Sequence, residues 1–431
     1  MKIVKTTDKS FGALFEGLLK RGRVDLDAVY STVAALLEDV KQRGDAALID
    51  QCRRFDRWEP QSIEDIIISA SEMKTAWENS DQKMKTALSI AFNRVKSFHK
   101  KQLQKSWIDF SPEGWLGQKI TPVDRAGLYI PGGKAAYPSS LLMCAAPAIA
   151  AGVDTVVACV PSPNGRTHPA VLAAAHLCGI KKAFKIGGAG AIGALAYGTA
   201  SVPKVEALAG PGNIYVAAAK KQVFGEVNVD MIAGPSEIGI IADESADADL
   251  VAIDMLSQAE HDEMASAILI TTSQNLAEKT LSAIYEELKG LEREEIAAKS
   301  IENRGAIIVA KSIDEAIDLM NLIAPEHLEI LTRSPHELLG RIKSAGAIFL
   351  GSFSPEAVGD YAAGPNHTLP TGGTARFFSA LGVENFVKRS SIISLTKEGF
   401  SEISGACAAL AKIEGLTAHR KSILKRLEGA S

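Results

Sequence analysis

The chain has 431 residues, more than one hydrophobic core normally serves, so two or more domains are expected. Its 47 basic and 51 acidic residues leave a formal net charge of -4, which gives no electrostatic indication of binding to nucleic acid or to an anionic membrane. The expected partner is therefore a small molecule.

The start of the chain, MKIVKTTDKS, lacks the apolar segment of a signal peptide. The most membrane-like stretch, residues 141–160, contains Pro147, Gly152 and Asp154, and we interpret it as a buried helix, a turn and a strand. Five cysteines without CxxC spacing indicate reduced thiols that pack in the interior, although a catalytic cysteine stays open. A cytoplasmic protein without membrane contact is expected.

In chain order, the first segments are charged and helical. Apolar side chains recur at three- and four-residue spacing in residues 25–55 and 83–103, which predicts amphipathic helices there. From about residue 120 the pattern changes to short apolar runs, such as DTVVACVPSP and KKAFKIGG, that alternate with helical segments, such as HPAVLAAAHLCGI and NIYVAAAKKQVFG. A second set of this kind begins at SEIGIIAD. The alternation predicts two α/β domains, each with a parallel sheet covered by helices.

The segment after about residue 380 predicts a small helical tail. Gly415 and Thr417 separate two helical patterns, so that Glu414 closes the first and His419 opens the second. A tail this short has no core of its own, and it must dock on the main body or on another subunit.

The segment GGAGAIG spells G-x-G-x-x-G at Gly188, Gly190 and Gly193, between a predicted strand and a helix. This is the context of a dinucleotide-binding fingerprint, but no acidic strand end follows at the expected distance. Glycines that let two helices pack closely are the alternative interpretation.

Two other glycine-rich turns, residues 129–140 and 209–220, also lead from a strand into a helix. Asn213 is a natural N-cap in the second turn. Exposed main-chain amides at such turns suit a phosphate or a carboxylate, although ordinary connecting loops have the same spacing.

Two pairs of polar residues follow apolar runs. Gln258 and His261, in SQAEHDE, lie one helical turn apart and indicate either one edge of a metal site or a hydrogen-bonded cap on a core helix. Glu326 and His327, in APEHLEIL, are sequence neighbours, so their side chains diverge and suit two separate proton transfers rather than one relay. A capped helix start is the alternative for the second pair.

The remaining candidates lie near glycine, proline or carboxylates. Asp360 and His367 belong to the glycine-rich segment EAVGDYAAGPNHTLPTGG, and Ser236 precedes a predicted buried strand in AGPSEIGIIAD. The other histidines, His99, His168, His176 and His336, are assigned no chemistry.

Seven motifs spread over nearly the whole chain resemble those of the histidinol dehydrogenase family, and they occur in the same order: LYIPGG, AGPGN, AGPSEIGIIAD, LSQAEHD, APEHLEI, GDYAAGPNHTLPTGG and IEGLTAH. The resemblance implies an NAD-dependent oxidation of L-histidinol through L-histidinaldehyde to L-histidine, the last two steps of histidine biosynthesis. Several collinear motifs are far more specific than any one of them.

The resemblance also implies roles for individual residues. One Zn²⁺ per subunit is expected, with the ligands Gln258, His261, Asp360 and His419. His327 is expected to be the general base of the alcohol step, and Glu326 to activate water in the aldehyde step. The substrate pocket is expected to contain the zinc ligands and His327 together with Ser236, His367 and Glu414.

Cofactor contacts carry over to Tyr129 and Asn213. Gly190 stands where the family commonly has Gln, and this replacement alone creates the G-x-G-x-x-G spelling, so we interpret the fingerprint as accidental. The family also implies a homodimer in which the C-terminal tail reaches across to the partner.

Taken with the resemblance, the expected fold is α/β, with two incomplete Rossmann-like domains, parallel sheets, and helical N-terminal and C-terminal extensions. The expected division is an arm (1–25), a discontinuous first domain (26–128 and 239–380), a second domain (129–238) and a tail (381–431). Two alternatives stay open: a related zinc and NAD dehydrogenase of another small polar alcohol, and a non-catalytic protein that binds a metal or a nucleotide.

Overall fold

The computed structural model describes residues 1–22, 26–132 and 136–428. Most of the chain belongs to one compact unit, Met1–Gln102 with Val123–Phe386, and a smaller unit combines Leu103–Pro122 with the chain from Val387 onward. The larger unit contains two six-stranded sheets, named here the β5 sheet and the β10 sheet after their central strands.

The β5 sheet has the parallel order typical of doubly wound folds, with one antiparallel edge strand. The chain runs outward from β5 through β6 to β7, then returns to the other side of β5 to form β8 and β9. Across the sheet the strands are β2 (Ile67–Ser69), β7 (Lys182–Phe184), β6 (Thr155–Cys159), β5 (Arg125–Tyr129), β8 (Ala207–Ala209) and β9 (Asn228–Val229).

The β10 sheet repeats this winding with all strands parallel. The chain again moves outward from the centre, through β11 to β12, and returns beside β10 as β13. Across the sheet the strands are β1 (Ile3–Lys5), β12 (Ala306–Val309), β11 (Ser266–Thr271), β10 (Glu237–Ala242), β13 (His327–Leu331) and β14 (Ala347–Leu350). The two sheets confirm the predicted pair of α/β folds with parallel strands.

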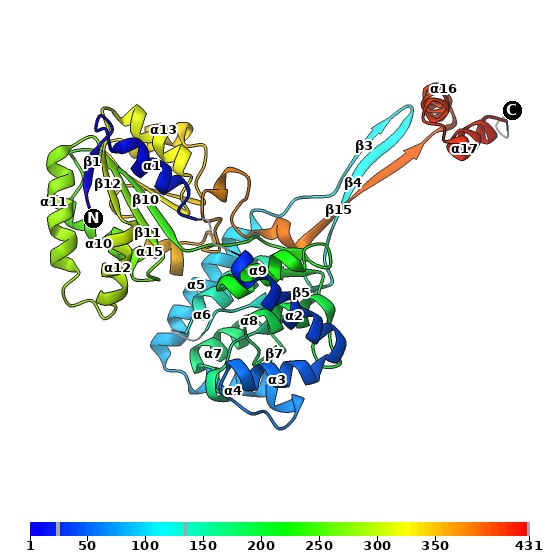
Figure 1. Ribbon diagram of the computed structural model, residues 1–431. Helices are drawn as coiled ribbons and strands as arrows, with labels where there is room; N and C mark the ends of the chain where they lie inside the picture. Colours follow the sequence, from blue (N-terminus) through cyan, green and yellow to red (C-terminus); the bar gives the residue numbers. More distant parts are fainter. Residues whose placement is uncertain (23–25, 133–135, 429–431) are drawn as a thin grey trace. The chain divides into compact units, whose positions relative to one another are not determined.

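Both faces of the β10 sheet are buried, which explains its nearly continuous apolar strands. Ile240 faces a core shared with α10 (Ala248–Ala259), α11 (Gln274–Glu287) and α12 (Glu294–Arg304). Ile241 faces the opposite core, to which Leu18 of α1 (Phe11–Leu19) and Ile317 of α13 (Ile313–Ile323) contribute. Figure 1 shows α1 and α13 together on one face of this sheet.

The helices around the β5 sheet complete the larger unit. Residues 25–55 were expected to be helical, and the described residues from Asp27 to Phe55 form two helices that separate at Gly44, whose φ of 54° is left-handed. The helices are α2 (Asp27–Arg43), α3 (Asp45–Phe55), α4 (Ala70–Asn79), α5 (Gln82–Lys100), α6 (Pro138–Ala151), α7 (Pro169–Leu177), α8 (Gly188–Tyr197) and α9 (Ile214–Gln222). Two short helices, α14 (Pro335–Leu338) and α15 (Glu356–Tyr361), lie beyond β13.

The packing of residues 27–69 differs from the expected grouping of 26–128 with 239–380. Helix α2 lies beside α8 and α9, and β2 pairs with β7, so this segment joins the β5 sheet (Figure 1). The physical reason is the small side chains of α8, since Gly193 leaves room for Leu37 and Val40 of α2. The division into domains otherwise stays a prediction, and residues 23–25 of the expected arm lie outside the described residues.

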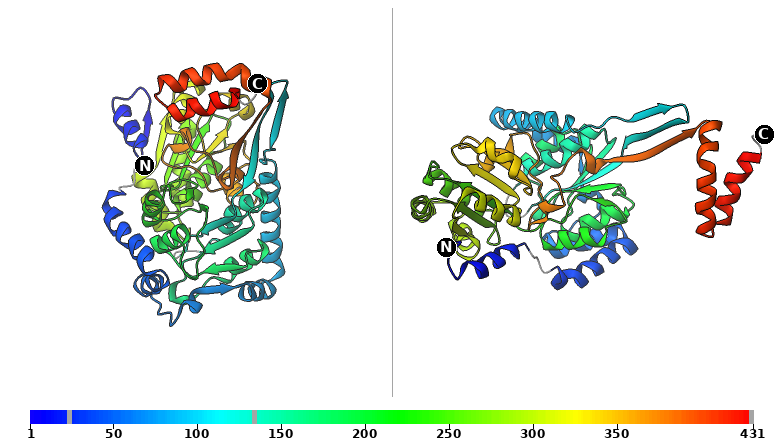
Figure 2. Two further views of the ribbon diagram at one scale, coloured as in Figure 1. Left: turned by 90° about the vertical axis from the view of Figure 1, so that its right-hand side faces the viewer. Right: turned by 90° about the horizontal axis from the view of Figure 1, so that it is seen from above.

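The smaller unit contains an antiparallel three-stranded sheet and two helices. The strands are β3 (Trp107–Ser111), β4 (Gly114–Pro122) and β15 (Val387–Leu395), with β4 in the centre. Figure 2 shows α16 (Lys397–Ile413) and α17 (Thr417–Glu428) side by side, separated at Gly415 as expected. The predicted all-helical tail is wrong over residues 387–395, where VKRSSIISL pairs with β4 as a strand.

Other expectations are also decided by the structure. Residues 141–160 form the end of α6, a turn at Gly152 and strand β6, and no helix in the described part of the chain has the length and apolar composition of a membrane span.

All five cysteines are free, and burial raises the pKa of the Cys52 and Cys144 thiols to about 12. These thiols are poor nucleophiles because they stay protonated near neutral pH.

Candidate active site

Glu326 and His327 lie at the amino end of β13, next to the amino end of β10. His327 is the first residue of the strand and pairs in register with Ile238 of β10. The alternative of a capped helix start is therefore wrong. The expected divergence of the two side chains is not seen at their polar ends, since the distance between Glu326 Oε2 and His327 Nδ1 is only 3.7 Å.

Both side chains bind the main chain of one residue, Glu237. The N–H of Glu237 donates to Oε2 of Glu326 at 2.8 Å, and Nδ1 of His327 donates to the carbonyl oxygen of Glu237 at 3.1 Å. The second bond places the proton of a neutral imidazole on Nδ1, so Nε2 carries the free lone pair. Nε2 is buried and has no hydrogen-bond partner among the described residues.

Burial changes the proton affinity of this pair. It raises the pKa of Glu326 to about 8, although His327 opposes the effect. Burial alone would lower the pKa of His327, but the carboxylates of Glu326, Asp360 and Glu356 raise it to about 10. The pKa of Glu326 is therefore close to the range where general bases work, whereas the neighbouring carboxylates favour the protonated form of His327.

Two carboxylates of α15 face His327 from the other side. Glu356 and Asp360 are four residues apart, one helical turn, so they share a face of the helix. Nε2 of His327 lies 3.6 Å from Oδ1 of Asp360 and 4.0 Å from Oε1 of Glu356. Burial alone would raise the pKa of Asp360, but His327 holds it well below its usual range.

His261 approaches the same carboxylate just after the end of α10, one turn beyond Gln258. Nδ1 of His261 lies 3.3 Å from the main-chain oxygen of Gln258, and its Nε2 lies 3.7 Å from Oδ2 of Asp360. The amide oxygen of Gln258 is buried and has no hydrogen-bond partner among the described residues. A capping role would have satisfied this oxygen, so the arrangement favours the metal-site interpretation over the cap.

His367 and Ser236 lie at the edge of this cluster. Nδ1 of His367 lies 2.9 Å from the main-chain oxygen of Asp360, and burial lowers the pKa of its imidazole. Ser236 is half-buried and immediately precedes β10. Glu414 and His419 belong to the smaller unit, where they follow α16 and lie in α17, and their part in the site stays a prediction.

The donors of the larger unit fit a divalent metal ion. Atoms of His327, Glu356 and Asp360 lie within 4.8 Å of one another, and Asp360 also lies 3.7 Å from His261. Imidazole nitrogen and oxygen donors are ordinary ligands of Zn²⁺. Buried lone pairs without a donor, on Gln258, Glu356 and His327, are costly unless a cation or a substrate group meets them.

Three residues of the cluster were missed from the sequence as site residues. Glu237 begins β10 in the segment AGPSEIGIIAD, and its main chain supports both Glu326 and His327. Glu356 lies one helical turn before Asp360, and Glu329 interrupts the apolar strand HLEIL two residues after His327, on the same face. A buried strand with an ionisable residue, and an acidic pair at helical spacing, were the available signals.

A candidate cofactor site lies at the carboxyl edge of the β5 sheet. The winding reverses between β5 and β8, and ligands of such sheets bind where the loops after these two strands diverge. Tyr129 ends β5, and the segment from Gly210 to Asn213 follows β8. Asn213 caps α9, since its Oδ1 accepts from the N–H groups of Tyr215 and Val216. Residues 133–135 of the other glycine-rich turn lie outside the described residues.

The glycines of GGAGAIG serve helix packing. A Cβ at Gly190 would meet Oε1 of the buried Gln51 at 2.3 Å, and a Cβ at Gly193 would meet Leu37 at 3.1 Å. Both glycines lie inside α8 rather than in the turn before it. The packing alternative therefore accounts for them, and a cofactor contact at Gly190 stays a prediction.

Gly210, in the loop after β8, lies very close to the main chain of Tyr129 at the end of β5. Its φ is +132°, and an added Cβ would lie 1.9 Å from the main-chain oxygen of Tyr129. We expect Gly210→Ala to lower the free energy of unfolding by about 3 kcal/mol. Gly188→Ala is the control, because Gly188 also has positive φ (+57°) but nothing within 4 Å, and should cost about 1 to 2 kcal/mol. Urea unfolding of both variants measures the difference, and equal costs would contradict it.

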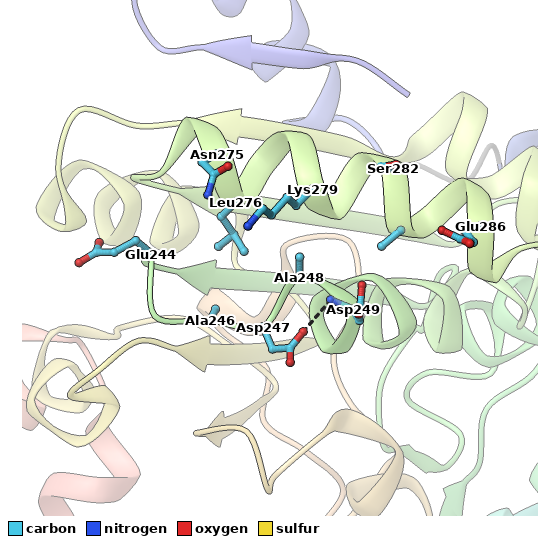
Figure 3. Close-up of a pocket in the computed structure, with 11 residues that line it drawn as sticks. Glu244, Ala246, Asp247, Ala248, Asp249, Asn275, Leu276, Lys279, Ser282 and Glu286 are labelled. Atoms are coloured by element: carbon cyan, nitrogen blue, oxygen red, sulfur yellow. Dashed lines mark hydrogen bonds between the residues drawn. The ribbon is translucent and has the colours of Figure 1, made fainter.

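A separate pocket of about 460 Å³ lies at the opposite, carboxyl edge of the β10 sheet, between α10 and α11 (Figure 3). Glu244, Asp247 and Glu286 line it, with Lys279 as a cation. This excess of carboxylates disfavours a phosphate group. The clustered donors at the amino ends of β10 and β13 are therefore the better candidate for chemistry.

Comparisons with known proteins agree with this arrangement. Residues 19–427 match the family model described as histidinol dehydrogenase. Histidinol dehydrogenases from Sulfurimonas denitrificans and Wolinella succinogenes are 58% and 56% identical, and each alignment covers 99% of this chain and 100% of the relative. A crystal structure of histidinol dehydrogenase from Elizabethkingia anophelis superposes with a TM-score of 0.93 at 35% identity and covers 100% of this chain and 98% of that one. The chain therefore belongs to the histidinol dehydrogenase family of NAD-dependent oxidoreductases.

Proposed function

We propose that the protein oxidises L-histidinol to L-histidine through L-histidinaldehyde, with two molecules of NAD⁺ as hydride acceptors. The observation that carries the proposal is the buried pair Glu326 and His327, which lies beside Asp360 in a chain that belongs to this family. A proton acceptor for the alcohol and a second one for water are what the two oxidation steps require.

In the alcohol step, His327 is the proposed general base. Its Nδ1 is occupied by the carbonyl oxygen of Glu237, so the free Nε2 accepts the hydroxyl proton as hydride leaves for NAD⁺. The products of this step are the aldehyde, NADH and a proton. The bond to Glu237 keeps the imidazole in the tautomer that can act.

In the aldehyde step, Glu326 is the proposed base. Its carboxylate accepts a proton from water as the oxygen attacks the aldehyde carbon, and the hydrate then delivers hydride to a second NAD⁺. Burial raises the pKa of Glu326 to about 8, which makes it a stronger base than an exposed glutamate.

The proposed metal ion is one Zn²⁺ per subunit, held by Gln258, His261 and Asp360 of the larger unit and by His419 of the smaller one. Bound there, it would hold the amine and imidazole of the substrate and, as a cation beside Asp360, would favour the neutral form of His327. Ser236, His367 and Glu414 complete the proposed substrate pocket.

The proposed cofactor contacts are Tyr129 and Asn213, at the reversal point of the β5 sheet. We expect Asn213→Ala to raise KM for NAD⁺ about tenfold, since a cofactor hydrogen bond is lost together with the helix cap. Ser312→Ala is the control: Ser312 caps α13 through the N–H of Glu315, so it should lower stability by a similar ~1 kcal/mol without changing KM. Steady-state kinetics at varied NAD⁺ decide this, and an unchanged KM in Asn213→Ala would contradict the contact.

The function is tested with the purified full-length chain, Zn²⁺, NAD⁺ and L-histidinol. The expected result is two NADH and one L-histidine for each histidinol consumed. NADH formed with another small polar alcohol, and none with histidinol, would favour the related dehydrogenase. Absence of NADH with every alcohol would favour the non-catalytic alternative, although Glu326 and His327 are both present.

We further propose a homodimer in which the smaller unit is exchanged. Its support is the large number of exposed apolar side chains in that unit, among them Phe110 (74% exposed), Ile393 (71%) and Ile413 (81%), which is typical of a surface that another chain covers. Ile413→Glu should shift sedimentation toward the monomer, whereas Phe55→Glu, at the end of α3, should not. A dimer that persists in Ile413→Glu would contradict the proposal that this apolar surface is covered by the partner chain. A cytoplasmic location remains part of the proposal.

A further inference from the structure

We propose that Glu237 is a positioning residue for both proton-transfer groups, and that Arg21 holds it in place. The inference rests on the proposed function, because it concerns how Glu326 and His327 are oriented. Nothing in the sequence marks Arg21, which lies more than two hundred positions before the strand it contacts.

The main chain of Glu237 binds both proton-transfer groups. Its N–H binds the carboxylate of Glu326 at 2.8 Å, and its carbonyl oxygen binds Nδ1 of His327 at 3.1 Å. A displacement of this one residue would therefore misplace the base of the alcohol step and the base of the aldehyde step together. Ordinary strand pairing at the edge of β10 does not require either contact.

The side chain of Glu237 accepts a hydrogen bond at each of its two carboxylate oxygens. Oε2 accepts from Nη2 of Arg21 at 2.7 Å, and Oε1 accepts from the N–H of Gly372 at 2.9 Å. The side chains of Arg21 and Glu237 are only 4% and 2% exposed. Solvent therefore screens this ion pair little, and its charges favour one geometry strongly.

Arg21, which binds the Glu237 carboxylate, is itself held by contacts with the main chain. The guanidinium of Arg21 also donates to the main-chain oxygens of Leu18 and Ile323, at 3.0 Å in each case. The neighbouring Gly22 packs directly on Gly372, where an added Cβ would lie 2.0 Å from the Cα atom. Arg21 and the loop at Gly372 thus bind the Glu237 carboxylate directly, and the ends of α1 and α13 hold Arg21.

The alternative is that the ion pair only stabilises the fold. The two roles differ in a double variant. Removing one partner leaves a buried uncompensated charge, whereas removing both leaves none. If the pair only stabilises, Arg21→Met/Glu237→Gln should recover stability and turnover together. If the pair positions the two bases, the double variant should recover stability while its turnover stays low.

The test compares Glu237→Gln, Arg21→Met and the double variant with the wild type, each loaded with Zn²⁺ and saturated with NAD⁺. We expect kcat to fall about 100-fold for histidinol and for histidinaldehyde, because a misplacement of 1 Å can cost that much. KM values and zinc content should stay within about twofold of wild type, since no ligand or cofactor contact is removed. The melting temperature should fall in the single variants and return toward wild type in the double variant.

Asp243→Asn is the matched control, at the other end of the same strand. Asp243 accepts from the N–H of Arg333 at 3.0 Å and so links β10 to β13 far from the two bases. It should lower the melting temperature without changing kcat. Wild-type kcat in Glu237→Gln, or in the double variant, would overturn the positioning role. Failure of the wild type to form NADH would instead overturn the proposed function.

Discussion

Replacing His261 with Asn is expected to abolish zinc binding and to lower NADH formation from histidinol at least about 100-fold. Loss of a ligand exceeds the 10- to 100-fold effect of losing a residue that only supports one. Nε2 of His261 lies 3.7 Å from Oδ2 of Asp360, close enough for one ion to bind both atoms, and the shorter Asn side chain cannot place a donor there. The remaining proposed ligands of the larger unit would be the neutral amide of Gln258 and the carboxylate of Asp360.

The measurement is zinc content by atomic emission, together with turnover and melting temperature. The fold should persist, because His261 is only partly buried and lies after the end of α10. His176→Asn is the control, since this histidine lies in α7 against Trp77 and has no part in the site. Wild-type zinc content in His261→Asn would show that the ion, if present, is held elsewhere.

The parts of the fold that the sequence predicted are those where the local pattern and the tertiary environment agree. Strands such as β10 and β11 are buried on both faces, so their apolar runs are readable without any long-range information. The helices α16 and α17 separate at Gly415, whose φ of +71° few other residues adopt. In each case one local physical cause determines the outcome.

The predictions that were wrong concern features that depend on which distant segments of the chain meet in the fold. The helix α2 carries an apolar face that could cover any sheet, and only the small residues of α8 place it on the β5 sheet. Strand β15 is largely exposed on both faces, so its sequence lacks the alternation that marks a strand. Neither fact can be derived from a local window.

In the candidate site, too, some residues could be identified from the local sequence and others only from the folded structure. Gln258 and His261 are one helical turn apart, and Glu326 and His327 are neighbours, so each pair could be found locally. The meeting of these pairs at Asp360 depends on α10, β13 and α15 coming together, and was available only through the family resemblance. The contact between Arg21 and Glu237 carries no local signal, since an ion pair between a turn and a strand is defined by the fold.

Replacing Glu326 with Gln is expected to slow the aldehyde step by about 10²- to 10⁴-fold, the usual contribution of a general base, and the alcohol step by only a few-fold. Gln is nearly isosteric, and its amide oxygen can still accept the N–H of Glu237, so the position of the side chain is kept while its basicity is lost. The intermediate should then leave the enzyme, and the yield of NADH should fall from two to about one per histidinol. Equal slowing of both steps would contradict the separate roles of Glu326 and His327.

The pH dependence of the aldehyde step gives this substitution a second readout. Burial raises the pKa of Glu326 to about 8, so the base is mostly protonated below that pH. The rate with histidinaldehyde in the wild type should therefore rise as the pH increases and level off above about 8, because only the carboxylate can accept a proton from water. In Glu326→Gln this rise should disappear, since an amide does not titrate in this range. A wild-type profile that is flat between pH 6 and pH 9 would mean that another group activates the water.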